Sequence, residues 1–240
     1  MPTAPCNDAG MEATEVRKLA ALEDAHWWYR ERRHLLARDV RGLQPGTALD
    51  VGAAGGGNTR VLRALGWQAI ALEYGADGAA VADERGLATL RGDATALPVA
   101  DGALDLVVAF DVLEHLDDDL AAAREVRRVL RPGGHFLVAV PADPRLWSAH
   151  DEAVSHVRRY TRPTLTAVLS RAGFALGPMR SWNVLLRPVV AARRRVTTGS
   201  DLSEPSPLVN GGLRAVITAE RYLPVGRLPG VSLMVSARRP

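Results

Sequence analysis

Cysteine is almost absent from this sequence: Cys6 is the only one among 240 residues. A chain with one cysteine can form no internal disulfide framework and no cysteine-based zinc site, and it fits the reducing cytoplasm. Lysine is equally scarce, since Lys18 is the only one, and arginine fills the other cationic positions. Arginine is therefore expected at ordinary solvated positions as well as at any binding site.

Long hydrophobic runs are also missing. The most apolar candidate, 184–192, contains Arg187 and Pro188 and is much shorter than the roughly 20 residues that a membrane-spanning helix needs. The first fifteen residues carry three acidic side chains in place of the basic segment that opens a signal peptide. The sequence therefore predicts neither a transmembrane segment nor a signal peptide. The expected location is cytoplasmic, with peripheral membrane contact left open.

The net charge of +3 is unevenly distributed along the chain. From Arg171 onward there are eleven arginines and three acidic residues, a local charge of +8, which leaves −5 for residues 1–170. A basic C-terminal part can bind nucleic acid, an anionic membrane surface or a phosphorylated substrate, or it can be an ordinary solvated surface. No Asn/Asp-Pro-Pro-Tyr motif and no RNA-binding module accompanies it, which disfavours a nucleic-acid substrate.

From residue 47 onward, short apolar runs alternate with helical stretches, and hydrophobic residues make up 47% of the chain, enough for a sizeable core. The runs expected to be strands are 47–51, 68–74, 88–91, 104–110 and 135–140, and the expected helices are 58–65, 76–85 and 120–130. Asp117 to Asp119 can cap the last of these helices, and Pro132-Gly133-Gly134 ends it. This rhythm predicts a doubly wound α/β fold, in which helices cover both faces of a mainly parallel sheet.

Two flanking segments lie outside this alternation, and we expect them to join the core in one domain. The expected parts of the single domain 1–240 are a helical cap at 11–41, the core at 42–182, a helical lid at 183–222 with a Ser/Pro loop at 200–207, and a final edge strand within 223–240. Segments 175–182 and 231–237 complete a sheet of seven strands. The last of these is expected to run antiparallel at the edge.

A glycine-rich segment leaves the first strand and enters a helix, with the sequence Leu49-Asp50-Val51-Gly52-Ala53-Ala54-Gly55-Gly56-Gly57. Small residues allow the backbone to turn sharply and to approach a ligand, and the following helix offers free N–H groups. Glu73 follows Asp50 by 23 residues, at the end of the second strand, where a carboxylate can accept both hydroxyl protons of a ribose. Together these residues predict a cofactor site, although Asp50 alone could serve only to cap its loop.

The order of the motifs resembles that of class I S-adenosylmethionine-dependent methyltransferases, and in particular a bacterial, type 11-like subgroup that acts on small molecules. The resemblance rests on the glycine-rich segment, on Gly92-Asp93-Ala94 after the third strand, on 110–115 (FDVLEH) after the fourth and on 130–134 (LRPGG) before the fifth. It covers residues 48–141. It departs from the family at Ala54, where the second glycine usually stands.

The resemblance implies that these motifs bind S-adenosylmethionine. Asp50 would orient the loop and the methionyl amine, and Glu73 would bind the ribose hydroxyls. The backbone of the loop and of Phe110 would lie along the methionyl group. The residues assigned to these parts of the cofactor are Asp50, Gly52, Ala53, Ala54, Gly56, Glu73 and Phe110.

The adenine would be bound by residues that follow the second and third strands. The resemblance implies that Tyr74 lies beside the adenine, that Asp93 accepts from its amino group, and that the Ala94 N–H donates to the ring. An aspartate in such a loop could instead only form an Asx turn. Tyr29, from an aromatic cluster near the N-terminus, is assigned to the cofactor as well.

Three alternatives to a small-molecule methyltransferase are a nucleic-acid methyltransferase, a dehydrogenase and a scaffold without catalysis. A dehydrogenase uses the same strand, loop and acid, but it would place Gly-x-Gly-x-x-Gly at the turn, which this loop fits only partly. It would also leave segments 92–94 and 110–115 unexplained. The scaffold is supported only by Ala54.

Methyl transfer is an in-line displacement, so the enzyme mainly has to position donor and acceptor and to exclude water; a base is needed only where the acceptor loses a proton. The candidates for catalysis are His115, His156, Asp151 and Tyr160, with His150 as a further base. His115 could equally be a satisfied histidine near the sheet edge. Asp111-x-x-Glu114-His115 could form part of a metal site, as in some O-methyltransferases of this class, but the sequence has no second cluster, and no metal is predicted.

Two further segments, 26–33 (HWWYRERR) and 151–160, resemble acceptor-binding insertions of the same subgroup. Three adjacent aromatic residues on a helix cannot all face one way, so at least one is expected to cover the cleft, unless the helix only docks on the core through them. His156, Arg158 and Tyr160 alternate, so an extended backbone would point them together toward an anionic or phenolic acceptor. The predicted function is methyl transfer to an O, N or C atom of a small molecule.

Overall fold

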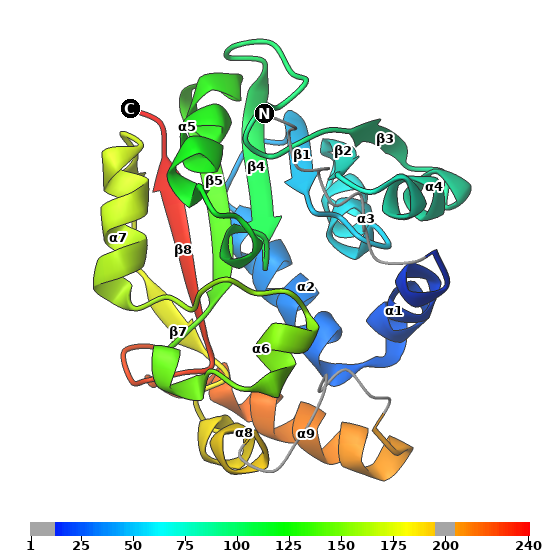
Figure 1. Ribbon diagram of the computed structural model, residues 1–240, viewed down its shortest axis with the longest axis vertical. Helices are drawn as coiled ribbons and strands as arrows, with labels where there is room; N and C mark the ends of the chain where they lie inside the picture. The colour runs from blue at the N-terminus through cyan, green and yellow to red at the C-terminus, as the bar shows by residue number, and fades with distance from the viewer. Residues whose placement is uncertain (1–12, 195–204) are drawn as a thin grey trace, which may run out of the picture.

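The computed structural model describes residues 13–194 and 205–240 and is built around one eight-stranded sheet (Figure 1). The strands are β1 (Thr47–Val51), β2 (Gln68–Glu73), β3 (Ala88–Arg91), β4 (Leu104–Phe110), β5 (Leu130–Pro141), β6 (Ala175–Leu176), β7 (Arg180–Trp182) and β8 (Ser232–Arg238). Their order is β3-β2-β1-β4-β5-β8-β6, and β7 also pairs with β8. Cys6, residues 11–12 of the expected cap and residues 200–204 of the expected Ser/Pro loop lie outside the described residues.

The first five strands run parallel, as the alternation of strands and helices predicts. The bounds of β1 and β4 coincide with the predicted apolar runs, and both strands are largely buried, as expected for a sheet covered on both faces. The strand order reverses at β1, which has β2 on one side and β4 on the other. Helices on opposite faces diverge at such a point and leave a crevice at the carboxyl ends of the strands.

The last strand, β8, is antiparallel as predicted, but the prediction that it forms the edge is wrong. It lies between β5 on one side and the short strands β6 and β7 on the other. Its residues from Ser232 to Val235 are all buried, which suits an interior strand. The predicted strand 175–182 is split at Pro178, which has no N–H to donate to the ladder, so the sheet has eight strands instead of seven.

Residues 13–194 and 205–240 contain nine α-helices. They are α1 (Ala13–Ala25), α2 (Trp27–Val40), α3 (Gly57–Ala64), α4 (Ala76–Glu84), α5 (Asp119–Val129), α6 (Ala149–Ala153), α7 (Arg162–Arg171), α8 (Arg187–Arg193) and α9 (Pro207–Glu220). The predicted cap of α5 is confirmed, since the Asp118 carboxylate accepts a hydrogen bond of 2.8 Å from the Ala121 N–H. None of the described helices is long and apolar enough to cross a membrane.

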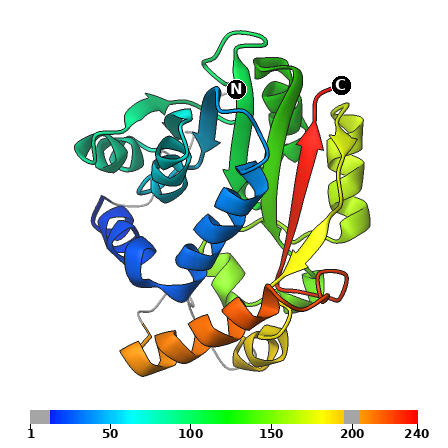
Figure 2. The ribbon, with the colours of Figure 1, turned by 180° about the vertical axis from the view of Figure 1, so that it is seen from behind.

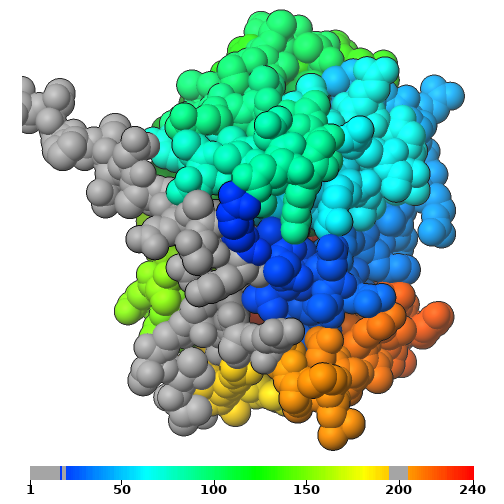
Figure 3. All heavy atoms as spheres, turned by 90° about the vertical axis from the view of Figure 1, so that its right-hand side faces the viewer, coloured from blue at the N-terminus to red at the C-terminus, as the bar shows by residue number. Residues whose placement is uncertain are grey.

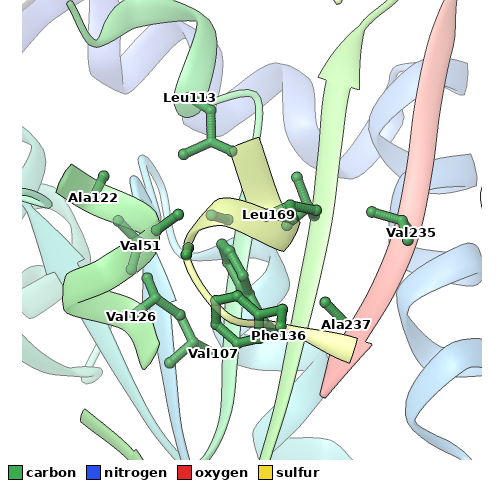
Figure 4. Packing of buried hydrophobic residues seen from close by; sticks show 14 of the residues in the cluster. Val51, Val107, Leu113, Ala122, Val126, Phe136, Leu169, Val235 and Ala237 are labelled. Carbon is green, nitrogen blue, oxygen red and sulfur yellow. The ribbon is translucent and has the colours of Figure 1, made fainter. Parts of the chain in front are cut away.

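Hydrophobic side chains fill both faces of the sheet. Along β4, Val107 and Ala109 face one core together with α5 and α7, while Leu106 and Val108 face the other together with α2 and α9. Figure 4 shows the first core, in which Phe136 and Leu169 lie among aliphatic side chains of the strands and α5. Figure 2 shows α2 crossing the opposite face. The doubly wound fold predicted from the sequence is therefore confirmed.

The segments outside the alternation meet at the carboxyl ends of the parallel strands. Figure 1 shows β4 pointing toward the end of the molecule where α6, α8 and α9 lie, and Figure 3 shows α1 beside α9 on one surface. The Asn210 side chain joins them, since it accepts from the Trp27 N–H at 2.9 Å and donates to the Ala25 carbonyl at 3.0 Å. Trp28 packs on Trp182, with ring centroids 4.2 Å apart. The helical segments thus enclose the end of the sheet where the crevice lies.

Candidate active site

A cavity of about 1360 Å³ occupies the crevice between the sheet and the flanking helices. Binding sites for single small molecules are typically about 300–1,000 Å³, so this volume can hold two ligands side by side. Among the residues that line it are Tyr29, Arg32, Gly52, Ala53, Ala54, Phe110, Asp111, His115, His150, His156, Arg159, Leu186, Val189, Val190, Arg193, Arg194, Val209 and Leu213. The sequence-predicted residues Tyr29, Gly52, Ala53, Ala54, Phe110, His115 and His156 are therefore brought together.

The glycine-rich loop forms one wall of this cavity. Gly52 has φ of 66°, and a Cβ there would lie 2.7 Å from Cγ2 of Val112, so only glycine fits without movement. Gly56 caps α3 with φ of 78° and offers no side-chain cap, which leaves the first N–H groups of this helix available. Ala54 also has a positive φ, 48°. The alanine that departs from the family pattern therefore adopts a conformation that glycine adopts more readily.

Asp50 lies behind the loop and does not line the cavity. Its side chain is fully buried, and its Oδ2 accepts a hydrogen bond of 2.7 Å from the Thr59 hydroxyl, which ties β1 to α3. Its Oδ1 has no hydrogen-bond partner among the described residues. Burial raises the pKa of Asp50 to about 6, although the bond from Thr59 opposes this shift. Asp50 therefore braces the loop from behind, and its predicted contact with the methionyl amine stays a prediction.

Glu73 ends β2 and contacts the loop directly, because its carboxylate accepts a hydrogen bond from the Ala54 N–H. Burial raises the pKa of Glu73 to about 7, and the bond from Ala54 partly offsets this. The Gly92 N–H donates to the Glu73 carbonyl at 3.0 Å, which places the start of segment 92–94 beside the end of β2. Glu73 therefore lies next to the segment assigned to the adenine, but it is not in the cavity wall.

The remaining predicted adenine residues are accessible and lie outside the cavity wall. Tyr74 has 53% of its side-chain surface exposed. Asp93 accepts hydrogen bonds of 2.7 Å from both the N–H and the hydroxyl of Thr95, so it forms the Asx turn that the sequence left as the alternative. Gly56 and Ala94 are also absent from the wall. These residues lie at neighbouring strand ends, and their predicted contacts with a cofactor stay predictions.

An ion pair that the sequence did not predict joins the end of β4 to the helical cap. Asp111 has a positive φ of 55° and forms an ion pair of 2.7 Å with Arg32 of α2. The Arg32 guanidinium also lies 5.4 Å from the centroid of the Phe110 ring. Only the tertiary structure brings α2 to β4. The one sequence feature that could have indicated this contact is the run of arginines after the aromatic cluster. Tyr29 lines the same region, and burial raises its pKa to about 12, so its hydroxyl stays protonated.

Two histidines from separate segments meet on the cavity wall. His115 and His156 have ring centroids 4.8 Å apart. His156 Nδ1 lies 2.9 Å from the Asp151 carboxylate, which is fully buried and also accepts from Arg159 at 2.7 Å. Although burial alone would raise it, the pKa of Asp151 is held well below its usual range by the bonds with His156 and Arg159. Asp151 therefore orients His156 from behind and does not itself reach the cavity.

Tyr160 and Arg158 do not join this pair, so the prediction that they point the same way as His156 is wrong. The Tyr160 hydroxyl donates to Asp119 at 2.6 Å, and its side chain is 2% exposed. Arg158 forms an ion pair of 3.1 Å with the same carboxylate. The alternation fails because residues 156–159 form no strand, and only Tyr160 makes an isolated bridge, with Ala142. Tyr160 is a buried structural residue outside the cavity.

The comparisons with known proteins point to methyltransferases. Residues 49–138 match the family model described as a methyltransferase domain. The chain is 30% identical over 172 residues to a probable S-adenosylmethionine-dependent methyltransferase of Mycolicibacterium smegmatis, a match that covers 69% of this chain and 66% of that protein. It is 29% identical over 159 residues to the ubiquinone biosynthesis O-methyltransferase of Pseudomonas paraeruginosa, covering 58% of this chain and 68% of that protein.

The fold has relatives among solved structures as well. The crystal structure of the [4+2]-cyclase SpnF superimposes with a TM-score of 0.66 at 21% identity, covering all of this chain and 98% of that one. At this identity the likeness concerns the fold alone. The sheet and the glycine loop define a class I methyltransferase fold. Residues 49–138 belong to the methyltransferase-domain family, and the chain is similar to S-adenosylmethionine-dependent methyltransferases, with a match that spans just under two thirds of the length of the Mycolicibacterium relative.

Proposed function

We propose that this protein transfers a methyl group from S-adenosylmethionine to a small-molecule acceptor inside the cavity. The observation that carries the proposal is the continuity of the cavity, whose wall runs from the loop residues Gly52, Ala53 and Ala54 to the histidines His115 and His156. A donor held at the loop and an acceptor held near the histidines would lie side by side. Bringing two reactants together in a fixed orientation is the main contribution that this reaction needs from a protein.

The donor would be held by the residues that surround the loop. Bound S-adenosylmethionine supplies an electrophilic methyl group on its sulfonium centre. Asp50 braces the loop through Thr59 and has one buried oxygen available for an amino group. Glu73 lies at the end of β2, where its carboxylate accepts a hydrogen bond from the Ala54 N–H. A bound ribose could replace this N–H as the hydrogen-bond partner of the carboxylate. Tyr74, Asp93 and Ala94 would contact the adenine.

The acceptor would be held by the far wall, which combines apolar and cationic side chains. The helices α8 and α9, with the N-cap residue of α8, contribute Leu186, Val189, Val190, Val209 and Leu213, while two arginines line the same cavity, namely Arg193 and Arg194. This combination favours an acceptor with an apolar body and an anionic or phenolic group. The name of the Pseudomonas relative, an O-methyltransferase of ubiquinone biosynthesis, supports an acceptor of this kind. In this proposal α1 and α2 form the cap and α8 and α9 the lid, and the two exclude water from the cavity.

Calorimetric titration with S-adenosylhomocysteine, and separately with NAD, tests the cofactor assignment. We expect the wild-type protein to bind the first ligand only, and Glu73→Ala to weaken that binding by about 1.5–3 kcal/mol, or roughly 10- to 150-fold, the usual worth of a hydrogen bond to a charged group. Asp83→Asn, which removes an exposed carboxylate of α4, is the matched control and should bind as the wild type does. If the folded wild-type protein binds neither ligand, the proposal fails; binding of NAD alone would favour a dehydrogenase.

A further inference from the structure

We propose that Glu114, His115 and His156 form a binding site for one divalent transition-metal ion on the wall of the cavity. Each residue offers a ligand atom, and these atoms all lie within 4.8 Å of one another. His156 Nε2 is 3.8 Å from Glu114 Oε1. Metal–ligand bonds of about 2.0–2.2 Å place neighbouring ligand atoms roughly 3–3.6 Å apart, so small side-chain rotations complete the site.

The Glu114 carboxylate is the strongest sign that a cation belongs here. Its side chain is 0% exposed, and neither oxygen has a hydrogen-bond partner among the described residues. An ionised carboxylate left in this state is strongly destabilised, because it has lost its hydration and has no compensating hydrogen bond. A proton would remove the charge but would leave the resulting hydroxyl without an acceptor. A bound cation neutralises the charge and occupies the carboxylate oxygens as well.

The neighbouring arginines are already engaged with other carboxylates. Arg32 pairs with Asp111 at 2.7 Å, and Arg159 pairs with Asp151 at 2.7 Å. Neither is within ion-pair distance of Glu114. The described structure therefore contains no arginine partner for this carboxylate, and a metal ion is the charge that completes the group.

The two histidines are prepared to act as ligands. Asp151 binds His156 Nδ1 at 2.9 Å, and such a carboxylate behind a ligating histidine fixes the ring so that Nε2 faces the metal. His115 lies on the same wall, with its ring centroid 4.8 Å from that of His156. Asp151 is thus a positioning residue in this site.

The composition of the group indicates which kind of ion it would hold. Two imidazoles and one carboxylate suit zinc, iron, manganese or cobalt better than calcium or magnesium, which prefer oxygen ligands. Three protein ligands leave at least one coordination position open. Because His115 and His156 line the cavity, that position faces the place proposed for the acceptor, and an oxygen atom of the acceptor could occupy it. This last step rests on the proposed function, whereas binding of the ion does not.

Titration of Zn²⁺ into the full chain, after removal of metal with a chelator, tests the site directly. We expect one Zn²⁺ per chain, and we expect Glu114→Gln and His156→Ala each to weaken binding by at least about tenfold. His115→Ala provides the same test if Glu114→Gln fails to fold. His150→Ala is the matched control: this histidine lines the same cavity, with its ring 6.2 Å from that of His156, but it is outside the three-ligand group and should keep wild-type affinity.

Two results would overturn the site. One is the absence of Zn²⁺ binding by wild-type protein that retains its native circular dichroism spectrum. The other is an equal loss of affinity in His150→Ala and His156→Ala, which would indicate unspecific binding by cavity histidines. Titration of the same metal-free sample with S-adenosylhomocysteine separates this outcome from a failure of the proposed function, because the residues assigned to the cofactor do not include the three ligands.

Discussion

The Glu73 carboxylate should make the protein less stable at neutral and alkaline pH than a variant that lacks its charge. Glu73 is largely withdrawn from water, and its one recorded hydrogen bond comes from the Ala54 N–H. Glu73→Gln keeps an oxygen that can accept this bond but cannot ionise. The substitution therefore isolates the free-energy cost of placing a negative charge at the end of β2. A bound ligand would provide hydrogen-bond partners for this charge.

The sign and size of the effect follow from the pKa of Glu73, which burial raises from 4.5 to about 7. The folded protein holds this proton more tightly than the unfolded chain, so the associated stability is complete below pH 4.5 and is lost as the pH rises through 7. A shift of this size corresponds at most to roughly 3 kcal/mol, and we expect about 1–3 kcal/mol. Glu73→Gln should thus be more stable than the wild type at pH 8, with little difference at pH 4.5.

Urea unfolding at several pH values between 4.5 and 8.5, without ligand, measures this difference. The gap between Glu73→Gln and the wild type should open with rising pH and level off above pH 7. Asp83→Asn removes an exposed carboxylate from the neighbouring helix and should follow the wild type throughout. A gap that does not change with pH, or a variant less stable than the wild type at pH 8, would refute the argument from burial.

Two further predictions concern single residues. Ala54→Gly should stabilise the protein by about 0.5–1 kcal/mol in thermal unfolding, because Ala54 has φ of 48°. Ala53→Gly, the control, should destabilise it by a similar amount, because it removes a buried methyl group. A less stable Ala54→Gly together with a more stable Ala53→Gly would contradict the strain at Ala54. Tyr160→Phe should cost about 1–2 kcal/mol of stability, since it removes the buried hydrogen bond of 2.6 Å to Asp119 and leaves this carboxylate only its ion pair with Arg158, yet kcat and KM should stay unchanged once an acceptor is known. A large loss of kcat in a folded Tyr160→Phe would place Tyr160 in the reaction after all.

Much of the core could be predicted from the sequence because its signals are local. The runs 47–51 and 104–110 are apolar throughout, and they form β1 and β4 with the predicted bounds, because a strand buried on both faces needs no alternation. The cap of α5 at Asp118 depends on a side chain and an N–H group three residues away. The glycine loop is equally local, since the positive φ at Gly52 and Gly56 is a demand of the backbone itself.

The arrangement of side chains at the acceptor end could not be predicted in the same way. The alternation of His156, Arg158 and Tyr160 indicated a shared direction, but residues 156–159 form no strand, and Tyr160 is buried with its hydroxyl bonded to Asp119. The interior position of β8 was missed for a related reason. The order of the strands depends on which pairs of strands bury the most surface together. A short stretch of sequence does not determine this order.

By itself, the sequence determined the parallel core, the cofactor loop and the family, because periodicity, glycine positions and motif order are properties of neighbouring residues. Only the tertiary structure decided that Glu114 and His115 meet His156, a residue 41 positions beyond His115, and that Asp151 lies behind it. The contact between these residues depends on the path of the chain after β5 and on the packing of α6. Both are determined by which surfaces are buried across the whole domain. The chemistry at the cavity wall is therefore a product of long-range contacts, whereas the loop that faces it is a product of local backbone geometry.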